Sequence, residues 1–424
     1  MHERSHETAH LEGRIEMIRK KTKQIAASIV AAALTCSSAC AGPAYDEGAS
    51  DSEIRIGNVA AASGPLAIYI TYREALKRCF DKINDDGGIN GRKIRFLSYD
   101  DAYNPSRTVE QTRKLVESDG VLFLIGGVGT ATSLAAAPYL SAKKVPHLFV
   151  ASAASKISDA AAYPWMMGWQ PVAAQEGAIF ARHMRAAAAS AGTPASIGVL
   201  YQNDDLGRDF LAGLKDGLGT DAQARLVSAR PYEAADPTIT SQIAQIKAAG
   251  ADTIYLAATG KFVAQAIKAI RELSWSPVIY LPYIANSPDI VLKAADLKGD
   301  EKLISSAFLK DPGAPAKAQD NDVKEWLSWM NSHYPSGNKA EVFNVWGWSI
   351  CQTTAHVLRK AGDNLTRANV MAMANALDAY KPPMVLPGIA MSSSPTQHRL
   401  TKCMQIQTFR DGRWNAAGET VCSD

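Results

Sequence analysis

The sequence lacks the charge imbalance that a nucleic-acid-binding surface needs. Its 424 residues carry 45 Lys and Arg against 42 Asp and Glu, a formal net charge of +3. Residues 1–41 hold six of these basic and four of these acidic residues, so the remainder is almost neutral. Such a balance gives no basic footprint for nucleic acid and no polybasic face for a membrane surface. We therefore expect no nucleic-acid partner.

Long hydrophobic runs are also missing. The apolar run at 25–35 has eleven residues, which is too short to cross a bilayer. It follows the basic segment Arg19–Lys23 and precedes an A-x-A cleavage pattern at 39–41. This order is typical of a secretory signal peptide, so we expect export to the periplasm. Cys40 leaves lipoprotein anchoring open, and Met17 leaves a second possible start of the chain.

Motifs for nucleotide binding and nucleophilic catalysis are absent. There is no Walker A sequence and no G-x-S-x-G elbow, and Gly127-Val128-Gly129 matches only half of a dinucleotide fingerprint. His6–His10 fits the H-E-x-x-H zinc-protease pattern, but it precedes the export signal and would be lost on cleavage. The paired acids at 100–101 and 204–205 each end a predicted strand, where helix capping is the simpler role. We expect no metal, no cofactor and no enzymatic activity.

Cysteine is scarce, and only four cysteines follow the expected cleavage site. Cys403 and Cys422 bracket a predicted hairpin that turns at Asp411-Gly412, and export permits disulfides, so we expect these two to be joined. Cys79 and Cys351 each lie in a predicted helix. A disulfide between them and a pair of buried free thiols both remain open.

What the sequence does contain is a repeated alternation of short β-rich runs and amphipathic helices. One series begins at Ile54, and a second follows a break at 169–171. This alternation predicts an α/β fold with two Rossmann-like lobes, each a parallel sheet with helices on both faces. The predicted strands lie at 54–60, 94–99, 121–125, 145–150, 197–201, 226–232, 252–256, 278–281 and 304–309. The predicted helices lie at 66–86, 106–118, 132–143, 175–189, 206–218, 239–249, 262–273, 321–332 and 343–360.

Six loops follow the carboxyl ends of predicted strands, where ligands bind in open parallel sheets. The first three are small and rich in hydroxyl groups, and free N–H groups and hydroxyls can hold a carboxylate without a cationic partner. Each loop taken alone is better explained as an ordinary turn or helix cap. Convergence of all six on one cleft would indicate a binding site. The loops lie at 63–65, 126–130, 151–155, 203–207, 258–260 and 282–286.

Four segments resemble the branched-chain amino-acid (Leu/Ile/Val) binding protein family of ABC importers, periplasmic type 1. They are Ser63–Tyr69, Ile83–Ile94, Tyr99–Asp101 and Tyr201–Gly207, and the resemblance runs from about Glu53 to the C-terminus. It implies a two-lobed fold with three hinge crossings near Gln170, Ser306 and Leu386. The implied division is an extension and signal peptide at 1–41, a first lobe at 53–170 plus 307–386, and a second lobe at 171–306 plus 387–424.

The resemblance also implies a ligand pocket, matched loop by loop. Thr130 corresponds to the hydroxyl that binds the ligand carboxylate. Ala154 stands where the amino-acid binders have a threonine, and Tyr283 stands where they have the acid that pairs with the ligand's ammonium group. The complete matched set is Tyr69, Thr130, Ser152, Ala153, Ala154, Leu206, Thr259, Tyr283 and Phe343.

The departures at Ala154 and Tyr283 carry a prediction about the ligand. An ammonium group taken out of water without a partner costs several kcal/mol, which is enough to abolish useful affinity. We therefore expect a small hydrophobic or aromatic carboxylate rather than an α-amino acid. By resemblance, the partners are an ABC permease with cytoplasmic ATPases, and the protein is a monomer. Branched-chain amino-acid binding, or a ligand-sensing module of the same fold, are the alternatives.

Overall fold

The computed structural model describes residues 17, 42–314 and 319–422. The expectations about the export signal, Cys40 and the His6–His10 motif lie outside the described residues. Among the described residues, no helix combines the length and the apolar character needed to cross a membrane. The fold presented here is that of the compact unit Tyr45–Asp424.

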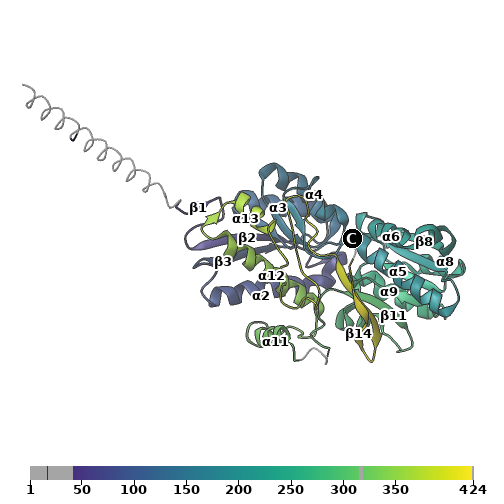
Figure 1. Ribbon diagram of the computed structural model, residues 1–424. Helices are drawn as coiled ribbons and strands as arrows, with labels where there is room; N and C mark the ends of the chain where they lie inside the picture. The colour runs from purple at the N-terminus through teal and green to yellow at the C-terminus, as the bar shows by residue number, and fades with distance from the viewer. Residues whose placement is uncertain (1–16, 18–41, 315–318, 423–424) are drawn as a thin grey trace, which may run out of the picture. The chain divides into compact units, whose positions relative to one another are not determined.

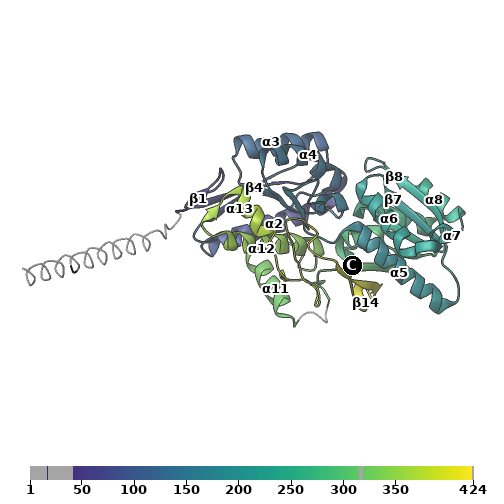
Figure 2. The ribbon, with the colours of Figure 1, turned by 45° about the horizontal axis from the view of Figure 1, so that its top comes forward.

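A five-stranded sheet is formed by the first part of this unit. All of its neighbouring strands are parallel, and their order is β3-β2-β4-β5-β6. Figures 1 and 2 show α3 and α4 on one face of this sheet and α2 and α12 on the other. The strands are β2 (Glu53–Val59), β3 (Lys93–Tyr99), β4 (Phe123–Ile125), β5 (His147–Val150) and β6 (Met166–Gly168). The helices are α2 (Ile70–Asp85), α3 (Pro105–Arg113), α4 (Thr130–Lys143), α11 (Asn321–His333), α12 (Val342–Ala361) and α13 (Arg367–Ala374).

A seven-stranded sheet with the order β14-β13-β11-β10-β9-β7-β8 forms the second part. Its strands from β11 to β8 are parallel, whereas β13 and β14 form an antiparallel hairpin on the β11 edge. The strands are β7 (Ile197–Gln202), β8 (Leu226–Tyr232), β9 (Thr253–Ala257), β10 (Val278–Tyr280), β11 (Lys302–Ala307), β13 (Cys403–Arg410) and β14 (Arg413–Cys422). The helices are α5 (Ala173–Ala191), α6 (Asp205–Leu218), α7 (Ala222–Arg225), α8 (Thr240–Ala248), α9 (Gly260–Glu272) and α10 (Lys293–Ala295), and two short strands, β1 (Ala44–Tyr45) and β12 (Asn364–Leu365), complete the set.

The expected α/β class with two sheets of parallel strands is confirmed. The strands of the first sheet lie between residues 53 and 168, and those of the second lie between 197 and 422. The division of the chain at Gln170, Ser306 and Leu386 stays a prediction. The C-terminal hairpin turns at the predicted place, where Asp411 and Gly412 both have positive φ angles of 53° and 74°.

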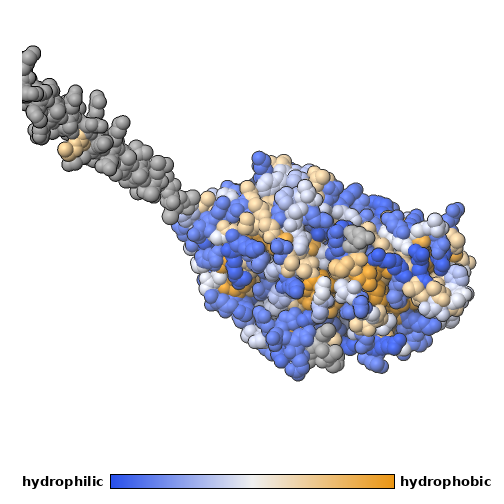
Figure 3. Space-filling model, in the orientation of Figure 1, coloured by the Kyte–Doolittle hydropathy of each residue, from blue (hydrophilic) through white to orange (hydrophobic). Residues whose placement is uncertain are grey.

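The cores of both sheets follow from their strand sequences. Central strands such as β4 and β9 are buried along their whole length, as strands covered by helices on both faces must be. The helix α9 instead has a buried face, with Phe262, Ala266 and Ile270 buried at helical spacing, whereas α12 is buried on all sides over Phe343–Cys351. On the face of the molecule drawn in Figure 3, hydrophilic residues cover most of the surface and hydrophobic residues show mainly in its recesses.

Two disulfides join described elements, one pair distant in sequence and one pair adjacent. Cys79 on α2 is joined to Cys351 on α12 across 272 residues, with an S–S distance of 2.10 Å. The second bond joins Cys403 to Cys422 and closes the β13–β14 hairpin. Of the two alternatives left open for Cys79 and Cys351, the structure has the disulfide.

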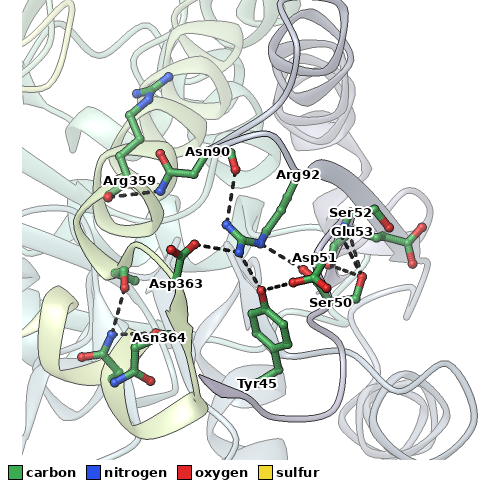
Figure 4. A network of polar contacts seen from close by, with 12 residues as sticks. Tyr45, Ser50, Asp51, Ser52, Glu53, Asn90, Arg92, Arg359, Asp363 and Asn364 are labelled. Atoms are coloured by element: carbon green, nitrogen blue, oxygen red, sulfur yellow. Dashed lines mark hydrogen bonds and ion pairs between the residues drawn. The ribbon is translucent and has the colours of Figure 1, made fainter. Parts of the chain in front are cut away.

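A buried arginine joins the start of β3 to the end of α12 (Figure 4). Arg92 is only 5% exposed. Its Nη2 donates to the Tyr45 hydroxyl at 2.7 Å and to Asp363 Oδ1 at 2.8 Å, while its Nε donates to the Ser50 carbonyl at 3.0 Å. Arg92 belongs to one of the segments that carried the family resemblance, and its role here is to hold the fold.

Candidate ligand-binding site

A cavity lies between the carboxyl ends of the strands of the two sheets. The space between its side chains amounts to about 470 Å³ when the open solvent at its mouth is included. Each of the six loops identified in the sequence contributes to its lining, or is followed directly by a residue that does. The lining residues are Leu66, Tyr69, Tyr72, Tyr103, Val128, Gly129, Thr130, Ala151, Ser152, Ala153, Gln170, Leu206, Thr259, Ile284 and Trp346.

The cavity lining is uncharged. Among the described residues that form it there is no Asp, Glu, Lys, Arg or His. Most of the lining is aromatic or aliphatic, with a small number of hydroxyl and amide groups. A pocket of this composition suits a largely apolar molecule whose few polar groups are held by hydrogen bonds.

Two buried hydroxyl groups meet at the start of α4. Thr130 is the first residue of this 14-residue helix, and its Oγ1 lies 2.8 Å from the Oγ of Ser152. Both residues are buried, with exposed fractions of 2% and 6%. The first-turn N–H groups of a helix lack intrahelical partners and carry the positive end of its dipole. This corner of the cavity therefore favours an anion.

The loop before α4 requires glycine at position 129. Gly129 has a φ of +107°, and a Cβ atom there would lie 2.4 Å from Cε2 of Tyr103. The missing side chain lets the Tyr103 ring lie against the loop. Burial raises the pKa of Tyr103 well above its ordinary value, and its hydroxyl interacts with the Ala131 N–H and the Gln202 side chain. Tyr103 thus reaches the cavity as a neutral phenol.

The paired acids at 100 and 101 shape the loop that presents Tyr103. Asp100 Oδ1 accepts hydrogen bonds from the N–H groups of Ala62 and Ala102, and Asp101 Oδ1 accepts one from the Tyr103 N–H. Ala102 and Tyr103 both have positive φ angles, of 51° and 57°, which these bonds stabilise. Burial opposes ionisation of Asp100, but hydrogen bonds from Ser63 and the backbone outweigh it and lower its pKa to about 2. The acids are structural, as their position after a strand suggested.

Tyr69 connects the two sides of the cavity. Its hydroxyl donates to the Ile284 carbonyl at 2.8 Å and accepts from the Gly260 N–H at 3.4 Å. Burial raises the pKa of Tyr69 well above its ordinary value. Its ring packs on Phe343, with 4.8 Å between ring centroids, and Phe343 packs in turn on Trp346 at 5.2 Å. The result is an aromatic wall that is continuous with the hydrophobic core.

Six of the nine residues matched from the resemblance line this cavity. They are Tyr69, Thr130, Ser152, Ala153, Leu206 and Thr259. The other three, Ala154, Tyr283 and Phe343, are buried behind the lining. A direct role of these three in ligand binding finds no support in this geometry.

Tyr283 is held away from the cavity by its own hydrogen bonds. Its hydroxyl donates to the Pro171 carbonyl at 2.6 Å, and its N–H donates to Glu176 Oε1 at 2.9 Å. The Ser306 hydroxyl donates to the same oxygen of Glu176. Tyr283 and Glu176 therefore join two of the predicted hinge crossings, near Gln170 and Ser306. Burial raises the pKa of Glu176 to about 8, and these two hydrogen bonds only partly offset the effect of burial.

Several lining residues were not singled out in the sequence, among them Tyr103, Gln170 and Trp346. Gln170 follows β6, a three-residue strand that the sequence pattern did not predict, so the loop after it was not recognised as a further ligand-binding loop of the first sheet. Tyr103 follows the paired acids at the end of β3. These acids were the sequence feature that could have marked its loop as part of the site. Trp346 lies in the first turns of α12, where it resembles any other apolar helix residue.

The sequence pattern of the periplasmic binding protein family matches residues 53–413. Among curated relatives, the Leu/Ile/Val-binding protein of Escherichia coli K12 is 23% identical over 217 residues. That match covers 51% of this chain and 57% of the relative, so the chain spans little more than half of the relative's length. The resemblance noted in the sequence is confirmed.

Solved structures agree with the fold. A branched-chain amino-acid ABC transporter protein from Thermus thermophilus with bound valine is similar, with a TM-score of 0.76 at 14% identity, covering 88% of this chain and 98% of that one. A solute-binding protein of an ABC transporter from R. palustris in complex with benzoate has a TM-score of 0.70 at 20% identity, covering 87% and 98%. At these identities the similarity establishes the shared fold.

Proposed function

We propose that this chain, which belongs to the periplasmic binding protein family, binds a small hydrophobic or aromatic carboxylate and delivers it to the permease of an ABC importer. The observation that carries this proposal is the composition of the cavity. It has a hydroxyl pair at a helix N-terminus and no charged side chain among its lining residues.

The corner formed by Thr130 and Ser152 is suited to the carboxylate. The two hydroxyls and the first-turn N–H groups of α4, other than that of Ala131, which is bound to Tyr103, can donate to an anion, and the helix dipole adds to the attraction. Hydrogen bonds to a charged group are stronger than those between neutral groups. An anion can therefore be held here without a Lys or Arg.

The same cavity offers no partner for an ammonium group. The carboxylate that pairs with this group in the amino-acid binders is replaced by Tyr283, whose hydroxyl is already bound to Pro171. Glu176, which lies beside Tyr283, is not a lining residue. Burial raises its pKa to about 8, so this carboxyl is neutral at lower pH. An α-amino acid would thus bury its cation unpaired, at a cost of several kcal/mol.

Closure of two lobes on the ligand is the proposed mode of action, with no catalytic step. Residues from both sheets line the cavity, and Tyr69 already spans it by hydrogen bonds to Ile284 and Gly260. A ligand that contacts both sides favours the closed arrangement over the open one. The closed form, as a monomer in the periplasm, would then bind a permease that works with cytoplasmic ATPases.

Thermal unfolding with a ligand panel tests the proposal. We expect benzoate-type acids or fatty acids to raise the melting temperature and leucine to leave it unchanged. A ligand at 100 times its Kd adds about 2.7 kcal/mol to the free energy of unfolding, which is easily measured. Thr130→Val should weaken binding by roughly tenfold or more through loss of a hydrogen bond to a charged group, whereas the exposed Thr193→Val should not.

Branched-chain amino-acid binding is the competing function, because the curated relatives carry that name. A melting shift with leucine and none with the other acids would establish it and overturn the proposal.

A further inference from the structure

One lining residue has a buried polar atom without a partner. Gln170 is 3% exposed, and its Oε1 is completely buried and makes no hydrogen bond. Among the described residues that line the cavity, no other side chain has a buried polar atom in this condition. Buried amide oxygens are normally satisfied by a hydrogen bond, because leaving one unpaired costs free energy.

The backbone around Gln170 is fixed on both sides. Trp169 donates its N–H to the Val150 carbonyl and its Nε1 to Thr353 Oγ1, and the Pro171 carbonyl accepts from the Tyr283 hydroxyl. The side chain of Gln170 therefore starts from a rigid position between the two sheets. An amide held in this way is preorganised to recognise a group on a ligand.

We infer that Gln170 is a specificity-determining residue whose amide oxygen accepts a hydrogen bond from a neutral donor on the ligand, so that the preferred ligand is a carboxylate that also carries a hydroxyl group. This inference rests on the proposed function. The donor is neutral because the lining residues offer no carboxylate to pair with a cation. The carboxylate occupies the corner at Thr130 and Ser152, and the hydroxyl group reaches Gln170.

A site with a buried acceptor discriminates strongly between ligands. The ligand that supplies the donor satisfies Gln170, whereas its deoxy analogue leaves the amide oxygen unpaired in both the free and the bound protein. Sites that hydrogen-bond a ligand hydroxyl therefore reject the analogue that lacks it far better than an apolar pocket rejects an added hydroxyl.

Matched carboxylates test the inference by isothermal titration calorimetry on the full chain. The probes are benzoate, its three hydroxy isomers, 4-methoxybenzoate, octanoate and 8-hydroxyoctanoate. We expect at least one hydroxy acid to bind roughly 10- to 100-fold more tightly than its parent acid. The methoxy acid should not share this gain, because an ether oxygen can accept a hydrogen bond but cannot donate one.

Gln170→Met separates recognition from packing. The variant keeps the side-chain length and removes the acceptor, so the roughly 10- to 100-fold preference for the hydroxy acid over its parent should disappear. The variant should unfold at the same or a higher temperature without ligand, because an unsatisfied buried acceptor is gone. The exposed Gln245→Met serves as the matched control and should behave as the unmodified protein.

The outcomes distinguish the inference from the function on which it rests. Binding of parent and hydroxy acids with equal affinity, or an equal gain from the methoxy group, overturns the role of Gln170 and leaves the proposed function standing. Equal weakening of every acid by Gln170→Met also overturns it, since that pattern indicates a structural role. Failure of all these carboxylates to bind overturns both.

Discussion

At the scale of single residues, Glu176 is a carboxyl group that the fold removes from water. It lies in the first turn of α5, with an exposed fraction of 0%, and one of its oxygens has no hydrogen-bond partner. The other oxygen accepts from the Tyr283 N–H and the Ser306 hydroxyl. Burial raises its pKa from an ordinary value of 4.5 to about 8. The folded protein therefore holds a proton that the unfolded chain releases.

This difference predicts a pH dependence of stability. Between pH 4.5 and 8 the folded state binds more protons than the unfolded state, so the free energy of unfolding should fall as the pH rises through this window. The loss from Glu176 alone should amount to roughly 3 to 5 kcal/mol. Glu341, whose pKa burial raises to about 7, acts in the same direction. Urea unfolding at several pH values measures the effect.

Glu176→Gln isolates the contribution of this one carboxyl. The amide is neutral at every pH and its oxygen can still accept from Tyr283, so most of the decline above pH 5 should vanish. The exposed Glu272→Gln should leave the decline intact. An unchanged pH profile in Glu176→Gln would show that the carboxyl is ionised in the folded protein.

At the scale of secondary-structure elements, the composition of the strands decided what could be predicted from the sequence. Runs rich in Ile, Val and Leu marked β4, β7 and β9, and the loops after them supplied Thr130, Leu206 and Thr259. The strand β6 has the sequence Met-Met-Gly, which contains no β-branched residue, so Gln170 was assigned to a crossing and its place at the cavity was missed.

Position in a loop was predictable, but side-chain direction was not. Tyr283 lies in the expected loop after β10, yet its hydroxyl points to Pro171 because a short helical turn at 283–285 rotates it away from the cavity. Ile284 occupies the lining in its place. Such a one-residue rotation depends on tertiary hydrogen bonds, which no local pattern contains.

The Arg92 network is an element-scale feature that can be measured. Arg92→Met removes donors to the Ser50 and Asn90 carbonyls and to the Tyr45 hydroxyl, and should lower the free energy of unfolding by about 2 kcal/mol. Asp363→Asn should cost less than about 1 kcal/mol, because the side chain of Asp363 is 70% exposed and water screens its ion pair with Arg92.

Comparison of the two variants by urea unfolding shows which contacts matter. Equal losses would mean that the ion pair, rather than the hydrogen bonds to the backbone and to Tyr45, holds the start of β3 to the end of α12.

At the scale of the whole molecule, the two disulfides should differ in their effect on stability. Cross-links act largely by restricting the unfolded chain, and the restriction grows with the length of the closed loop. The Cys79–Cys351 bond closes 272 residues and the Cys403–Cys422 bond closes 19. The chain-entropy estimate is roughly 5.5 kcal/mol for the first and about 3 kcal/mol for the second.

Double replacement of each pair by alanine tests this order. We expect the variant without the Cys79–Cys351 bond to unfold at the lower temperature, and the variant without the Cys403–Cys422 bond to keep ligand affinity, because its hairpin lies outside the cavity lining. A greater loss from the hairpin pair would contradict the loop-length argument.

The Cys79–Cys351 bond also sets an order of events during synthesis. While α2 has already emerged, its covalent partner on α12 is still 272 residues away, and every parallel strand of the second sheet is translated in between. The second sheet can therefore complete its parallel strands first, whereas the first sheet cannot be covered by α12 until that helix has been made. A growing chain halted before residue 351 would expose the apolar face of α2 that α12 normally covers, so the burial of this face depends on a segment that is made late in synthesis.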